Sequence, residues 1–267
     1  MTNTTSVTIL PYQKKAIDHF NRLCDFKGKT ILEIGAIPPF ETAREFLNRG
    51  AQKVVCIDYR SNLKDGTILE NLEFRNMDAR DLEFDNKQFD LVFGVAVLEH
   101  LPNLDKVLSE IFRVLVKGGY AYLHGGPIWS CNLGHHVYII VDKVHYFFNQ
   151  NNPIPHWHHL LYTPQEMITY LETQKLPSSH AQEIVKMVYE SPTLNRYSFE
   201  DFLRFFKKTK LTLIELNKTP WGNPTEEIRT RIKKSDKTLR NFSIRRLFPI
   251  RKERNLQTGE VSVLFKK

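Results

Sequence analysis

The chain has 267 residues and a formal net charge of +8, from 38 Lys and Arg against 30 Asp and Glu. Hydrophobic residues make up 41% of it and aromatic residues 12%, which excludes a disordered chain, a collagen and a coiled coil. No uncharged apolar run reaches the ~18 residues of a membrane-spanning helix, and the N-terminal residues do not resemble a secretory signal. The cysteines, Cys24, Cys56 and Cys131, lie far apart, so we expect free thiols and a cytoplasmic location.

Short apolar runs alternate with amphipathic segments in the first half of the chain. Helices are predicted over residues 11–24, around 43–47 and over 103–116, because their apolar residues recur at helical spacing. Strands are predicted at 30–36, 53–59, 72–79, 89–96 and 119–123. This alternation is typical of a parallel sheet with helices on both faces.

The regular alternation stops near Gly125. Residues 125–196 are rich in histidine and proline, which predicts an inserted substrate-binding or lid region. A helix over 198–208 and strands over 211–217 and 260–265 are predicted to follow. A polar, basic stretch at 218–259 separates these two strands and is predicted to be a second insertion.

Four groups of residues lie where predicted strands end, which is where open α/β sheets bind ligands. Glu33 and Gly35 end the first strand, and Asp58 ends the second. A carboxylate at the second position can accept hydrogen bonds from both hydroxyls of a ribose. Asp78 and Ala79 can offer a carboxylate and a backbone N–H to an adenine. The fourth group is the segment 94–100, after the fourth strand.

Five sequence segments in this order resemble class I S-adenosylmethionine-dependent methyltransferases, over about residues 28–124. The segments read L-E-I-G, C-I-D, M-D-A, F-D-L-V-F-G-V-A-V-L-E-H-L and L-V-K-G-G. The resemblance implies one methyltransferase domain over 1–267. Its fold class is α/β, with a Rossmann-like doubly wound seven-stranded sheet that is mostly parallel and whose last strand is antiparallel. The strands at 211–217 and 260–265 supply the final pair.

The resemblance also implies S-adenosylmethionine as cofactor and a set of residues around it. That set is Glu33, Gly35, Asp58, Tyr59, Asp78, Ala79, Gly94, Val95 and His100. The loop 33–39 departs from the family pattern E-x-G-x-G-x-G, because Ile37 and Pro39 replace two glycines. A dinucleotide needs a glycine-rich loop for its pyrophosphate, so this departure weighs against NAD. The expected reaction is methyl transfer to an oxygen or nitrogen of a small-molecule or saccharide acceptor.

Histidines in the insertion are candidates for the base of an O-methylation, because histidine titrates near neutral pH. We predict His136 or His159 for this role, while most of the other histidines are expected to be surface or core residues. His156, His158 and His159 do not have the spacing of a zinc site, so no metal is expected. Aromatic residues of the insertion could stack on a substrate or form its own core: Trp129, Tyr138, Tyr146, Trp157 and Tyr162.

Residues 229–254 carry 11 basic and two acidic side chains. Apolar residues such as Phe242, Leu247 and Phe248 lie among the charges, which suits an anionic membrane surface or a phosphate-bearing substrate. A cytoplasmic protein, peripheral at the inner membrane surface, is therefore one expectation, and a solvated arm is the other. Nucleic acid is a weaker expectation. Two other functions stay open: a catalytically silent binding protein with this fold, and an RNA-modifying methyltransferase.

Overall fold

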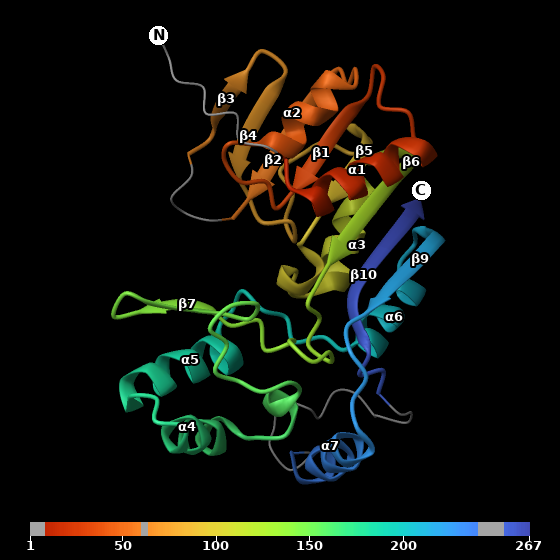
Figure 1. The fold of residues 1–267 in the computed structure, drawn as a ribbon. Helices are drawn as coiled ribbons and strands as arrows, with labels where there is room; N and C mark the ends of the chain where they lie inside the picture. The colour runs from red at the N-terminus through yellow and green to blue at the C-terminus, as the bar shows by residue number, and fades with distance from the viewer. Residues whose placement is uncertain (1–8, 60–63, 240–253) are drawn as a thin grey trace. The chain divides into compact units, whose positions relative to one another are not determined.

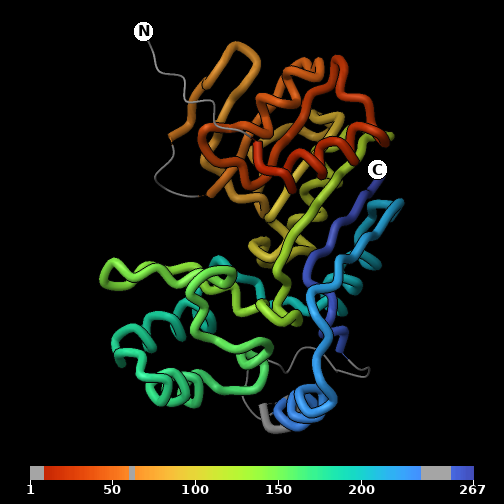
Figure 2. The backbone as a smooth tube through the Cα atoms, viewed as in Figure 1, coloured from red at the N-terminus to blue at the C-terminus, as the bar shows by residue number. Residues whose placement is uncertain are grey.

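The computed structural model describes residues 9–59, 64–239 and 254–267 (Figure 1). The chain forms two compact units. Unit 1 comprises residues 1–125, 204–217 and 262–267, and unit 2 comprises 126–203 and 218–261. Figure 2 traces the chain through unit 1 as far as Gly125, then through unit 2 and back.

One eight-stranded sheet has the order β3-β4-β2-β1-β5-β6-β10-β9. Its strands are β1 (Thr30–Ile34), β2 (Lys53–Asp58), β3 (Gly66–Leu69), β4 (Leu72–Asn76), β5 (Phe89–Gly94), β6 (Leu115–Gly125), β9 (Thr212–Pro220) and β10 (Thr258–Lys266). The pairs β1–β2, β1–β5, β2–β4 and β5–β6 are parallel, and β3 is antiparallel to β4.

The last strand, β10, runs antiparallel to β6. The N–H of Gly118, early in β6, donates to the carbonyl of Lys267 at 2.9 Å, and the Lys267 N–H donates to the carbonyl of Gly119 at 3.0 Å. Because the end of one strand meets the beginning of the other, the two strands have opposite directions. The predicted fold class, a mostly parallel α/β sheet with an antiparallel last strand, is confirmed.

Helices cover the sheet of unit 1. Apolar residues of α1 (Pro11–Leu23) and α2 (Glu41–Asn48) join alternate residues of the central strands in one buried cluster. Helix α3 (Leu104–Val114) contacts β6 and contributes nothing to that cluster, so it covers the opposite face (Figure 1). Helix α6 (Phe199–Lys208) precedes β9. This is the layering that near-continuous apolar strands require, since both of their faces are buried.

Unit 2 has its own hydrophobic core. The hairpin β7 (Tyr138–Val141) and β8 (Val144–Phe147) packs beside α5 (Ser178–Glu190), which also contacts α4 (Pro164–Thr173). Trp129, Tyr146 and Trp157 are buried in this core, whereas Tyr138 is exposed and Tyr162 packs at its margin. Most of the aromatic residues that could have bound a substrate therefore build the core of unit 2.

All seven predicted strands are present, and the predicted helices match α1, α2, α3 and α6 within a few residues. An eighth strand of the sheet, β3, was not predicted, because its four residues are all exposed and show no apolar alternation. Helices α4 and α5, the hairpin β7–β8 and helix α7 (Glu226–Leu239) were also not predicted. The division into one domain with insertions at 125–196 and 218–259 stays a prediction.

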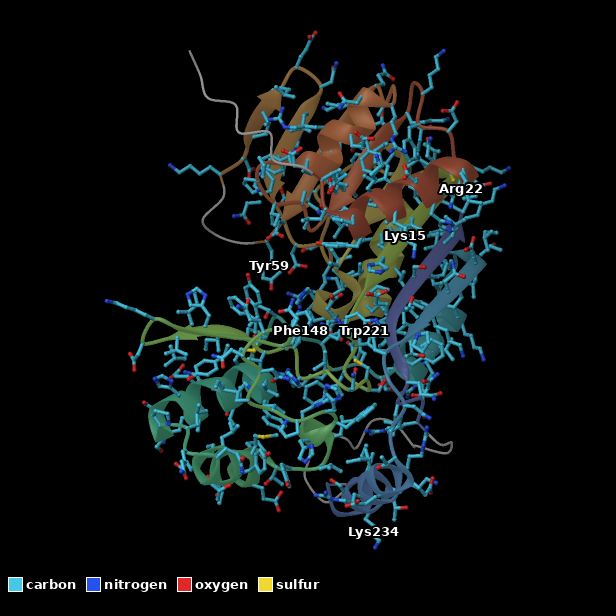
Figure 3. The ribbon with its side chains drawn as sticks, in the orientation of Figure 1. Lys15, Arg22, Tyr59, Phe148, Trp221 and Lys234 are labelled. Atoms are coloured by element: carbon cyan, nitrogen blue, oxygen red, sulfur yellow. The ribbon has the colours of Figure 1, made fainter. Side chains whose placement is uncertain are left out.

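The basic stretch is described only in part. Lys233 and Lys234 are exposed on α7 (Lys234 is labelled in Figure 3), and Ile232 is buried in the core of unit 2. Phe242, Leu247, Phe248 and the basic residues among them lie outside the described residues. Within the described ranges, no helix combines the length and the apolar character needed to cross a membrane.

Candidate functional site

The register of the sheet brings the predicted cofactor residues to one edge of unit 1. Ile34 pairs with Ile57, and Asp58, the next residue of β2, pairs with Asn76. On the other side of β1, Glu33 pairs with Phe93. The segments that follow β1, β2, β4 and β5 therefore leave the sheet at the same edge. The sheet order also reverses between β1 and β5, so this edge is a topological switch point, where α/β sheets bind their ligands.

Glu33 is buried beneath this edge rather than exposed on it. Its Oε2 lies 3.6 Å from the Cys56 sulfur on β2, and its carboxyl also accepts a hydrogen bond from Thr42 on α2. Burial raises the pKa of Glu33 to about 8, which the Cys56 and Thr42 hydrogen bonds only partly offset. The carboxyl is therefore largely protonated at neutral pH, and it ties β1 to β2 and α2.

Gly35 and Gly94 are required where the loops after β1 and β5 meet. A Cβ on Gly35 would lie 2.4 Å from a methyl group of Val97, and one on Gly94 would lie 2.7 Å from the other methyl. Gly35 also has a φ of +80°, which strains other residues. The N–H groups of Gly35 and Ala36 both donate to the carbonyl of Ile57, at 2.8 and 3.2 Å. Since these amides are engaged within the sheet, they are not available to cradle a pyrophosphate.

Asp58 and Tyr59 provide the polar end of β2. Asp58 is 7% exposed, and its carbonyl accepts the N–H of Met77 at 3.0 Å, which joins it to the segment after β4. Tyr59, labelled in Figure 3, is 50% exposed. A carboxylate beside an exposed aromatic ring suits a sugar hydroxyl pair and a flat base.

Asp78 forms an ion pair that the sequence analysis did not identify. Arg80 donates from Nε to both carboxylate oxygens at 3.0 Å and from Nη2 to Oδ2 at 2.6 Å. The side-chain hydrogen bonds from Arg80 lower the pKa of Asp78. An adenine amino group would therefore share this carboxylate with Arg80. Ala79, between the two, is buried.

The segment after β5 contains a buried carboxylate that was not predicted as a site residue. Val95 and His100 are partly buried, and Glu99 between them, in the short helix η1 (Leu98–His100), is 4% exposed. The carbonyl of His124 on β6 accepts the N–H of Val97 at 3.0 Å, which fixes the segment. The signal for Glu99 was present in the sequence as part of L-E-H-L, but nothing local showed that its side chain is buried.

The two predicted base histidines lie in unit 2. His159 is 2% exposed, its Nε2 lies 2.8 Å from the carbonyl of Trp129, and its ring stacks edge-on against the Trp129 ring. Burial lowers the pKa of His159 to about 4. A neutral Nε2–H donates to the carbonyl, so His159 has the environment of a core histidine and is a weak base at neutral pH.

His136 has a different setting. It is partly buried, has a φ of 48°, and its ring lies 5.0 Å from that of Phe148. The neighbouring His135 is fully buried. Burial lowers the pKa of His135 well below its ordinary value, and the surrounding histidines lower it further. The role of His136 as a base stays a prediction.

A buried hydrogen-bond chain ties the hairpin of unit 2 to α5. His180 contacts the Tyr146 hydroxyl through Nδ1 at 2.7 Å and Asp142 through Nε2 at 3.1 Å. Tyr146 and His180 are buried, whereas Asp142 is exposed at the hairpin turn. A neutral imidazole satisfies both contacts, since Nε2–H donates to the carboxylate and Nδ1 accepts from the phenol.

We expect His180→Ala to lower the free energy of unfolding by about 1–3 kcal/mol, because the Tyr146 hydroxyl is left buried without its partner. Chemical denaturation measures this loss. The exposed His145, on the same hairpin, provides the matched control, and His145→Ala should stay within about 0.5 kcal/mol. Adding Tyr146→Phe to His180→Ala should recover part of the loss, and failure to do so would show that the chain is not what stabilises the hairpin.

A known protein family matches the part of the chain whose strand ends form this edge. The family described as "Methyltransferase domain" matches residues 32–123, which run from β1 to β6. A ubiquinone/menaquinone biosynthesis C-methyltransferase of Brucella canis is 40% identical over 55 residues, which are 20% of this chain and 19% of that protein. A phthiotriol/phenolphthiotriol dimycocerosates methyltransferase of Mycobacterium leprae is 40% identical over 52 residues, with the same coverage. The matches thus span about a fifth of each relative.

Solved structures extend the similarity of fold to nearly the whole chain. An S-adenosylmethionine-dependent methyltransferase from Mesorhizobium loti superposes with a TM-score of 0.52 at 12% identity, over 96% of both chains. A phosphoethanolamine N-methyltransferase 2 from Haemonchus contortus, in complex with S-adenosyl-L-methionine, gives 0.51 at 14% identity, over 95% of this chain and 52% of that one.

Residues 32–123 thus match a methyltransferase-domain family, and over nearly the whole chain the fold is that of S-adenosylmethionine-dependent methyltransferases of known structure.

Proposed function

We propose that this protein binds S-adenosylmethionine at the carboxyl ends of β1, β2, β4 and β5 and transfers its methyl group to a small-molecule acceptor. The observation that carries the proposal is the register that gathers Gly35, Asp58 and Asp78 at one switch-point edge within the matched region. S-adenosylmethionine supplies a methyl group that its positive sulfur already activates, so the protein's contribution is mainly positioning.

The polar and aromatic groups at this edge suit S-adenosylmethionine better than a dinucleotide. Asp58 and the exposed Tyr59 suit the ribose and adenine, while the Gly35 and Ala36 amides are bonded to Ile57. S-adenosylmethionine has no phosphate and does not need those amides. Glu33 and Gly35 would lie under the methionine part, Asp78 and Ala79 beside the adenine, and Gly94, Val95 and His100 on the β5 side.

We expect Asp58→Ala to weaken S-adenosylmethionine binding by about tenfold or more, because charge-assisted hydrogen bonds to the ribose hydroxyls are lost. Titration calorimetry with S-adenosylmethionine and S-adenosylhomocysteine measures the change, and the melting temperature without ligand should barely move. The exposed Asp85 lies before β5, at the other end of the sheet, so Asp85→Ala serves as the control. If Asp58→Ala binds both ligands as tightly as the wild type, the central assignment of the site is wrong.

The acceptor is proposed to react through an oxygen or nitrogen. His136 is a proposed base, while the low pKa of the buried His159 argues against its removing a proton near neutral pH. The relatives named above include a C-methyltransferase, and their names give no support to a saccharide acceptor. Docking on an anionic membrane surface through 229–254 stays a further proposal, supported here by the exposed lysines of α7.

A second candidate is a protein with this fold that does not transfer methyl groups. A [4+2]-cyclase superposes with a TM-score of 0.50 at 10% identity, over 96% of this chain, so the fold by itself does not determine the reaction. Binding of S-adenosylmethionine without methyl transfer to any acceptor would favour this candidate.

A further inference from the structure

The carboxylate of Asp78, which the resemblance assigns to the adenine, already accepts a full set of hydrogen bonds. Its Oδ1 accepts the backbone N–H of Arg80 at 2.8 Å and the Arg80 Nε–H at 3.0 Å. Its Oδ2 accepts the same Nε–H at 3.0 Å and an Nη2–H at 2.6 Å. A carboxylate has about four lone-pair positions, two on each oxygen. Since all of them face Arg80, an adenine amino group could bind Asp78 only by displacing an Arg80 N–H.

Arg80 meets Asp78 with only one edge of its guanidinium, the edge that carries Nε and Nη2. Among the residues that the structure describes, Nη1 on the other edge donates to no protein group, and the Arg80 side chain is 38% exposed. A guanidinium is a planar fork of N–H donors and accepts no hydrogen bond. Asp78 therefore holds this fork in a defined orientation and leaves its second edge available to a ligand.

The pair lies at the strand ends that the cofactor is proposed to occupy. Asp78 follows β4, and the N–H of Met77, directly before it, donates to the carbonyl of Asp58 at the end of β2. Hydrogen bonds to Asp78 raise the pKa of Arg80, burial partly offsets this, and the nearby Tyr59 phenol raises it further. The Arg80 guanidinium is therefore close to Tyr59, the exposed ring that is proposed to contact the adenine.

We propose that Arg80, held in place by Asp78, contacts the purine of the cofactor and donates hydrogen bonds to it. This inference rests on the proposed function and specifies how the site recognises the base. Arginine recognises acceptor atoms, which in adenine are ring nitrogens, and it cannot accept a bond from the amino group. Hypoxanthine has a carbonyl oxygen in place of that amino group, which gives arginine a second acceptor beside N7. The site should therefore accept both bases, whereas a carboxylate without Arg80 would select adenine.

The test compares S-adenosylhomocysteine with S-inosylhomocysteine, which carries hypoxanthine in place of adenine, and it needs no identified acceptor. Titration calorimetry of the wild type and of Arg80→Ala measures both affinities. We expect the wild type to favour neither ligand by more than about threefold, since arginine donates to acceptor atoms of both bases. In Arg80→Ala the Asp78 carboxylate can accept from the amino group and repels the carbonyl oxygen. That variant should therefore favour S-adenosylhomocysteine by about tenfold or more.

Two further variants separate this role from a structural one. Adding Asp78→Ala to Arg80→Ala removes the exposed carboxylate and should abolish the new preference for adenine. Arg75→Ala is the matched control, because Arg75 on β4 pairs with Glu73, also two residues away, and its side chain is likewise 38% exposed. It should leave the ratio of the two affinities unchanged. If Arg80 and Asp78 only shaped the loop, their variants would weaken both ligands in proportion and keep that ratio.

The outcomes also distinguish this inference from the function on which it rests. If the wild type binds neither S-adenosylhomocysteine nor S-inosylhomocysteine, the proposed function fails. If it binds both and Arg80→Ala leaves the ratio of their affinities unchanged, only the role of Arg80 is overturned. A wild type that already favours S-adenosylhomocysteine by about tenfold overturns that role as well, because Asp78 then contacts the amino group in the presence of Arg80.

Discussion

Above pH 8, Glu33→Gln is expected to have a free energy of unfolding up to about 5 kcal/mol higher than that of the wild type. Burial raises the pKa of Glu33 from its ordinary 4.5 to about 8 in the folded protein. A raised folded-state pKa gives stability that is fully present below pH 4.5 and is lost as the pH rises through 8. The difference between the two pKa values sets the size of this loss, at ~1.4 kcal/mol for each pH unit.

The glutamine variant cannot ionise and keeps groups that can bond Cys56 and Thr42. Its free energy of unfolding should therefore change less with pH than that of the wild type. Denaturation at pH values from 5 to 9 measures the two profiles, with Glu70→Gln, at an exposed position of unit 1, as control. Parallel profiles for wild type and Glu33→Gln would mean that the carboxyl ionises in the folded protein as it does in water.

The same variant separates two roles of Glu33. If its carboxyl only ties β1 to β2 and α2, Glu33→Gln should bind S-adenosylmethionine as the wild type does. If the carboxylate contacts the methionine part of the cofactor, the variant should lose affinity. The structure shows the first set of contacts, and the resemblance to the family implies the second.

The strand-end residues were predictable because their position depends on local sequence. Each apolar run in the first half of the chain forms a strand, and parallel strands bring their carboxyl ends to one edge. Glu33, Asp58 and Asp78 follow from that rule without knowledge of any other contact. The fold class was predictable for the same reason.

Glu99 and Arg80 could not be recognised in this way. The burial of Glu99 depends on Gly125, which is distant in sequence and meets it only because β5 and β6 are neighbours. Arg80 is only two residues from Asp78, but a turn must bring the two side chains together for the ion pair to form. Both residues belong to segments that follow strands, where the path of the chain is set by tertiary contacts.

Helix α4 is a different case, because its signal is local. Thr163 accepts the N–H of Glu166, the Glu166 carboxylate accepts the N–H of Thr163, and Pro164 occupies the first turn. This capping box is visible in the sequence as T-P-Q-E. The histidines and prolines that precede it made the whole of 125–196 look irregular and concealed the helix.

Unit 2 is expected to lose stability as the pH falls from about 6.5 to 4. Burial lowers the pKa of His159 from 6.5 to about 4 in the folded protein. The unfolded chain therefore takes up this proton first, so the stability is present above pH 6.5 and is lost as the pH falls toward 4. At ~1.4 kcal/mol for each pH unit, the His159 contribution is about 3 kcal/mol. His135, whose pKa is also lowered, acts in the same direction.

All three tryptophans of the chain, Trp129, Trp157 and Trp221, lie in unit 2, so their fluorescence reports the unfolding of that unit. His159→Gln keeps a donor for the Trp129 carbonyl and has no group that titrates in this range. Urea denaturation followed by tryptophan fluorescence should therefore show a smaller loss of stability between pH 6.5 and 4 for this variant than for the wild type. His156→Gln changes an exposed histidine of the same segment and should behave as the wild type. If His159→Gln loses stability on acidification as steeply as the wild type, the imidazole is protonated in the folded protein, and His159 regains the basicity that a catalytic base near neutral pH requires.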